Sequence, residues 1–64
     1  MLSYEDLNHH IGGRVLITTQ FGDVRDVTIE SYSKNEIGVR AYVTGGYMTQ
    51  HIQRSQIRSI KDLD

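Results

Sequence analysis

The stretch that predicts the fold is IGVRAYVTGGYMTQHI, residues 37–52. Apolar and polar side chains alternate on both sides of two adjacent glycines, which is the pattern of two half-buried strands joined by a tight hairpin. Glycine accepts the positive φ that such a turn requires. We therefore expect the turn at Gly45-Gly46, with Val43 opposite Met48 on the inner face.

The same alternation extends in both directions along the chain. Val15, Ile17 and Phe21 are expected to point inward from one strand, and Val27 and Ile29 from the next. The expected strands span residues 14–21, 24–33, 36–44, 47–53 and 57–61. Five short antiparallel strands cannot bury a face as a flat sheet. The sequence therefore predicts an all-β fold, a five-stranded antiparallel barrel.

A short α-helix is expected before the strands, over residues 4–11. Ser3 and Asp6 have the spacing of a capping box, and Gly12 supplies a left-handed stop. The apolar stripe of this helix would consist of Tyr4, Leu7 and Ile11.

The composition restricts the class of protein. At 64 residues with no cysteine, the chain has room for a single small domain, residues 1–64, and cannot form disulfides. The formal charge of −1 gives no general attraction to nucleic acid. No apolar run approaches the ~20 residues of a membrane span and no leader pattern is present, so we expect a cytoplasmic location without membrane contact.

The residues do not suggest an enzyme, a metal site or a cofactor. A nucleophile elbow and a phosphate-binding loop are both missing. His9 and His10 are neighbours on the expected helix, so their side chains diverge and cannot both coordinate one metal ion. We therefore predict no catalytic residues and no metal ligands.

Cations and aromatic side chains gather on the expected outer face of the hairpin and after it. This mixture can anchor a protein partner, can stack on bases and pair with phosphates, or can be an ordinary solvated strand face. The candidate binding residues are Arg40, Tyr42, Tyr47, His51, Arg54 and Arg58.

Two further expectations concern single positions. Leu16 is a large aliphatic residue on the polar face of its strand, so it lies under the N-terminal helix or marks a subunit contact. Arg40 is expected opposite His51 across the hairpin, in which case protonation of His51 would lower stability at mildly acid pH.

The order of a helix, a glycine and five strands resembles bacterial Sm-like small barrels and, more broadly, SH3-like barrels. Gly22 stands at the turn glycine of the first Sm motif, and Asn35 opens its third strand. Residues 52–57 are similar to the second motif, in which an Arg-Gly turn presents side chains to RNA, although Ser55 stands here in place of the glycine. The layout is also similar to the Rho-binding antiterminator family, where the implied function is inhibition of a protein partner.

We therefore expect a non-enzymatic binding module that acts through protein contacts, as an adaptor or regulator, with self-association left open. The alternative is an Sm-like RNA-binding protein that uses the Gly45-Gly46 hairpin and the Arg54 turn. Salt would separate the two, because binding through phosphates weakens steeply as salt rises.

Overall fold

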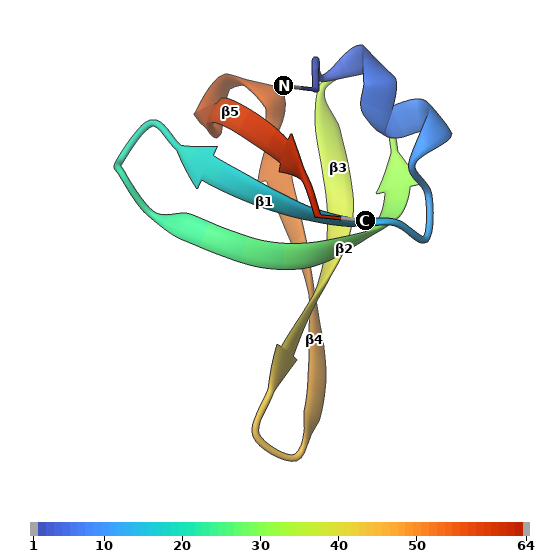
Figure 1. The fold of residues 1–64 in the computed structure, drawn as a ribbon, viewed down its shortest axis with the longest axis vertical. Helices are drawn as coiled ribbons and strands as arrows, with labels where there is room; N and C mark the ends of the chain where they lie inside the picture. Colours follow the sequence, from blue (N-terminus) through green and yellow to red (C-terminus); the bar gives the residue numbers. More distant parts are fainter. Residues whose placement is uncertain (1, 64) are drawn as a thin grey trace.

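The computed structural model describes residues 2–63 and contains one five-stranded antiparallel sheet (Figure 1). In chain order the elements are the 3₁₀ helix η1 (Glu5–His9), the strands β1 (Arg14–Thr19), β2 (Val24–Tyr32), β3 (Glu36–Val43) and β4 (Gly46–Gln53), the 3₁₀ turn η2 (Arg54–Gln56), and β5 (Ile57–Asp62). The strands lie in the order β4-β3-β2-β1-β5. The prediction of an all-β fold with five antiparallel strands is confirmed.

The sheet is not closed into a barrel, so that part of the prediction is wrong. Among the described residues, β4 and β5 are the two edge strands and do not pair with each other. The free side of β5 is taken instead by Leu2, whose N–H donates to the carbonyl oxygen of Ile60 at 3.1 Å. The element η2 carries the chain from one edge strand to the other.

The core lies between the inner face of the sheet and the N-terminal segment. Alternate residues of the strands point into it, as the period of two predicts. The buried apolar side chains are Tyr4, Leu7, Val15, Ile17, Val27, Ile29, Ile37, Val39, Ile52 and Ile60. We call the opposite side of the sheet the outer face.

The N-terminal segment is a 3₁₀ helix rather than the expected α-helix. Its backbone bonds join residues three apart, as in the bond from the Leu7 N–H to the Tyr4 carbonyl. The segment is short because the Gly12 N–H donates to the Ile29 carbonyl at 2.7 Å, which binds the chain to β2. Ile11 therefore lies outside the core and is 51% exposed.

The first strand ends two residues earlier than expected, at Thr19. The hydroxyl of Thr19 is turned inward and accepts hydrogen bonds from the N–H groups of Phe21 and Asp23, which closes the β1–β2 turn. Thr19 is buried, while Phe21 is 80% exposed. The expected inward position of Phe21 is therefore wrong, because the alternation stops where the turn begins.

The hairpin between β3 and β4 has the predicted faces but a different register. Val43 lies opposite Gly46, and Ala41 opposite Met48, so the two turn residues are Thr44 and Gly45. Gly45 has the positive φ of +89° that this turn requires. The observed pairing differs from the expected one by two residues along β4. A shift of two leaves each side chain on the same face.

Gly38 is a position where a side chain would meet a neighbouring strand. A Cβ atom at this buried residue would overlap the Oγ atom of Ser31 on β2, where the β2–β3 register shifts. We expect Gly38→Ala to lower the free energy of unfolding by about 1–3 kcal/mol. Adding Ser31→Ala should restore most of this loss, because it removes the overlapping atom. Urea denaturation measures both variants; simply additive losses in the double variant would contradict the explanation.

Candidate binding surface

The ends of β3 and β4 extend beyond the rest of the sheet as a two-stranded ribbon (Figure 1). The β2–β3 pairing ends at Thr28 opposite Arg40, whereas the β3–β4 pairing continues to Val43 opposite Gly46. We call residues 41–48 the hairpin arm. An isolated two-stranded hairpin is only marginally stable in water. The arm therefore lacks the support that β2 gives to the rest of β3.

The hairpin arm carries exposed apolar side chains on both faces. Tyr42 and Tyr47 lie opposite each other on the outer face and are 67% and 54% exposed. On the other face, Val43 is 48% and Met48 is 50% exposed. An apolar patch that extends over both sides of a protruding element is typical of an interaction site.

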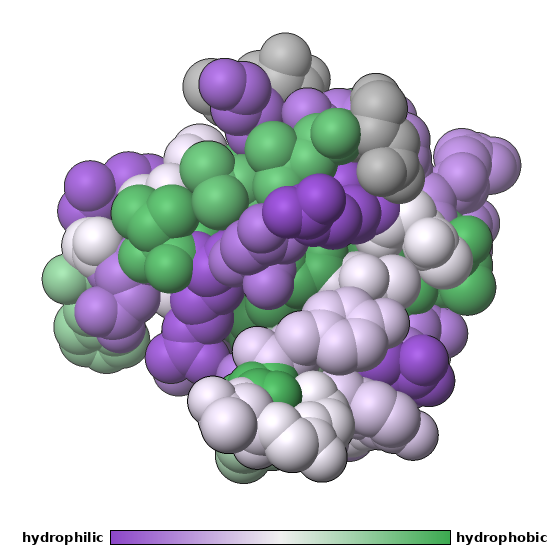
Figure 2. All heavy atoms as spheres, turned by 60° about the horizontal axis from the view of Figure 1, so that its bottom comes forward, coloured by the Kyte–Doolittle hydropathy of each residue, from purple (hydrophilic) through white to green (hydrophobic). Residues whose placement is uncertain are grey.

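The hairpin arm carries no acidic side chain, lysine or arginine. Residues 41–53 contain no Asp, Glu, Lys or Arg. In Figure 2 the tip of the arm faces the viewer in the lower part of the picture, mostly in the pale shades of intermediate hydropathy. Charged and strongly hydrophilic side chains lie around it. The arm thus has the aromatic and weakly polar composition found at the centre of protein interfaces.

Arg40 stands at the base of the hairpin arm, where it is bound by its neighbours. Its guanidinium lies over the Tyr47 ring, 4.3 Å from the centroid, and its Nη2 donates to Glu30 at 2.9 Å. The hydrogen bond with Tyr42, followed by the pairing with Glu30, raises the pKa of Arg40. Thr49 also donates to Glu30, at 3.2 Å. The structure thus brings Arg40, Tyr42 and Tyr47 into one cluster.

His51 lies on the outer face of β4 but not opposite Arg40. The partner of Arg40 across the hairpin is Thr49, and His51 faces Gly38. The expected Arg40–His51 pair is therefore wrong, as a consequence of the register. The predicted acid destabilisation through that pair loses its basis.

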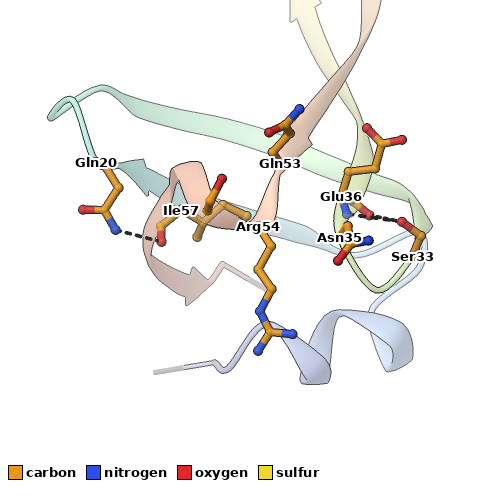
Figure 3. A pocket seen from close by; sticks show the side chains of 8 residues that line it. Gln20, Ser33, Asn35, Glu36, Gln53, Arg54 and Ile57 are labelled. Carbon is orange, nitrogen blue, oxygen red and sulfur yellow. Dashed lines mark hydrogen bonds between the residues drawn. The ribbon is translucent and has the colours of Figure 1, made fainter.

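Arg54 is directed toward the N-terminal segment. Figure 3 shows the open cleft that Arg54 shares with Gln20 and Asn35, and the Arg54 side chain extends out of it toward η1. There it bonds to the Glu5 carboxylate and lies over the Tyr4 ring, 4.9 Å from the centroid. A hydrogen bond from the Glu5 backbone, and then the one from Arg54, lower the pKa of Glu5.

The remaining candidate, Arg58, lies on β5, and its Nη2 donates to the carbonyl oxygen of Gln20 at 3.1 Å. Arg54 and Arg58 are therefore held by contacts in other elements, outside the Tyr42–Tyr47 cluster. Leu16 lies on the outer face, opposite Asp26 on β2 and Lys61 on β5. Its expected place beneath the N-terminal helix is wrong, because η1 packs on the inner face.

Sequence reasoning missed Val43 and Met48 as parts of the exposed surface. The alternation along the strands places both side chains on the inner face, where a closed barrel would have buried them. The structure exposes them because β2 does not pair with β3 beyond Arg40. No pattern in the sequence marks the residue at which a neighbouring strand stops.

Within residues 2–63, no three His, Asp or Glu side chains gather closely enough to hold a metal ion. No helix over the same residues has the length and apolar character needed to cross a membrane. Comparison with protein-family models, curated proteins and solved structures gave no match for this chain.

Proposed function

We propose that this chain is a non-enzymatic binding module, an adaptor or regulator, that captures a protein partner with its hairpin arm. The observation that carries the proposal is the uncharged, two-faced surface formed by Tyr42, Val43, Tyr47 and Met48. Tyrosine supplies a large contact area at a small cost in side-chain entropy, and it is enriched among the residues that dominate binding energy. We place the module among SH3-like or Sm-like small β-domains, which the order of its helical turn and five strands supports.

Protein contact is favoured over RNA binding because three arginine side chains already pair with carboxylates of the chain. Arg40 pairs with Glu30, Arg54 with Glu5 and Arg14 with Asp26, so much of their charge is balanced within the chain. Phosphate binding would have to compete with these carboxylates. An apolar partner surface would meet the exposed side chains of the arm without that competition.

The test is capture of a partner from a lysate of the source cells on the immobilised domain. We expect a protein to be retained in a stoichiometric amount and to survive nuclease treatment. Replacing both Tyr42 and Tyr47 by alanine should weaken capture by about tenfold or more. Phe21→Ala is the matched control, because it removes an exposed aromatic ring far from the arm in sequence and is expected to leave capture unchanged.

The RNA alternative predicts different results in the same assay. Capture would then be lost after nuclease treatment, and a titration with single-stranded RNA would weaken steeply between about 50 and 200 mM salt. Equal capture by the wild type and the double tyrosine variant would overturn the role of the hairpin arm in both readings.

A further inference from the structure

Within residues 2–63, no strand pairs with the side of β4 that faces away from β3, so this side is an open sheet edge. The Arg54 N–H donates to the Asn35 carbonyl at 2.8 Å, in the same register as the β3–β4 pairs. Because hydrogen-bonded and non-hydrogen-bonded pairs alternate, the odd-numbered residues of β4 direct their backbone groups away from β3. Among these, the Gln53 N–H already donates to the Gln56 side chain at 3.3 Å. The open part of the edge consists of Tyr47, Thr49 and His51.

This edge has none of the usual protection against strand pairing. Natural edge strands are blunted by charged residues, proline, bulges or short length. β4 has eight residues without a charge or a proline, and its pairing with β3 runs from Glu36–Gln53 to Val43–Gly46 without a register shift. Tyr47 and Met48 expose apolar surface on its two faces. β4 is thus suited to accept another strand.

The opposite edge of the sheet is protected. β5 carries Arg58, Lys61 and Asp62, and Leu2 already occupies its free side at Ile60. Pairing of β4 with β5 of a neighbouring copy would therefore require Leu2 to be displaced. An uncharged strand that pairs with itself meets no such obstacle and brings no like charges together.

We propose that two copies of this chain pair antiparallel through β4, about a two-fold axis at Thr49. In this register Thr49 lies opposite Thr49 of the second copy, and Tyr47 lies opposite His51 of the second copy. All three open positions of each edge then find partners. The contact is isologous, so it closes as a dimer and leaves no β4 edge for further growth.

The dimer also extends the outer face of the hairpin. Met48 of each copy would lie opposite Gln50 of the other on the inner side, while the two Tyr47 rings would flank the axis on the outer side. Arg40 and Glu30 balance each other next to Thr49, so no net charge accumulates beside the axis. This inference goes beyond the proposed function, and its test contains no partner protein, so either can fail without the other.

Solution mass gives the first test. Light scattering and sedimentation over a hundredfold concentration range should show the mass rise toward twice the 7.3 kDa of one chain, and no further. A constant monomer mass up to millimolar concentration would overturn the inference. Growth to a larger ring would also overturn it.

Thr49 allows the edge to be tested with matched variants. Thr49→Pro removes an N–H that points away from β3 and should weaken the dimer by about tenfold or more, because two intermolecular hydrogen bonds are lost. Thr49→Val also loses the hydroxyl contact with Glu30 but retains the N–H, so it should dimerise like the wild type. A folded Thr49→Pro variant with unchanged dimerisation would contradict the proposed pairing.

Cross-linking covers the case in which Thr49→Pro does not fold. The chain has no native cysteine, so Thr49→Cys introduces a single thiol at the axis. Directly opposed strand residues are close enough for a disulfide, and mild oxidation should yield a covalent dimer. Ser59→Cys on β5 is the control and should remain monomeric under the same oxidation. Equal cross-linking at both positions, or none at Thr49→Cys, would refute the axis.

Discussion

Ile29→Ala is expected to lower the free energy of unfolding by about 2–5 kcal/mol. Ile29 is fully buried at the centre of β2, and its backbone binds both Gly12 and Gly13. A chain of this length has a total stability of only about 3–10 kcal/mol. The variant should therefore lose a large part of its stability, which circular dichroism during a urea titration would show as a clearly lower urea midpoint.

Val24→Ala is the control for this prediction. Val24 lies on the same strand but is 60% exposed, so its loss should change stability by about 0.5 kcal/mol or less. Similar losses for Val24→Ala and Ile29→Ala would show that the inner face of β2 is not buried as described.

Leu7→Ala should lower the free energy of unfolding by a comparable amount, about 2–5 kcal/mol. Leu7 is fully buried although it belongs to a 3₁₀ helix of only five residues. A segment this short has no helical stability of its own in water, so its order depends on packing. The loss should appear as a lower urea midpoint by both fluorescence of the tyrosines and circular dichroism.

Asn8→Ala separates packing from helix propensity, because Asn8 is exposed in the same turn. We expect it to leave the urea midpoint nearly unchanged. If Leu7→Ala also left the urea midpoint nearly unchanged, the N-terminal segment would not contribute to the core of the domain.

The candidate surface was partly predictable from the residues. Arg40, Tyr42 and Tyr47 share a face because residues 40 and 42 are two apart on one strand, and the hairpin brings 47 onto the same side. Such local relations follow from the strand period. The positions of Arg54 and Arg58 depend on Glu5 and Gln20, which are distant in the chain, and no local pattern contains that information.

In the N-terminal segment, too, local features followed from the sequence and contacts with distant residues did not. Its capping signal was correct, since the Ser3 N–H donates to Asp6 at 2.9 Å and the Asp6 N–H to the Ser3 hydroxyl at 3.4 Å. These bonds join residues three apart and form in either kind of helix. They therefore do not select the 3₁₀ form that the structure shows over Glu5–His9, and the bond from Gly12 to Ile29 on β2 is a tertiary contact that the local signal does not contain.

By itself, the sequence determined the number of strands, the side chains on each face of the sheet, and the places where glycine turns the chain. These properties follow from a period of two and from local backbone sterics. The hairpin register was left to the folded molecule, because a slip of two residues preserves both faces and moves the turn only from Gly45-Gly46 to Thr44-Gly45. Closure of the sheet was decided in the same way. In the structure Leu2 occupies the free side of β5 at Ile60, a contact between two parts of the chain that are far apart in sequence and that only the tertiary structure brings together.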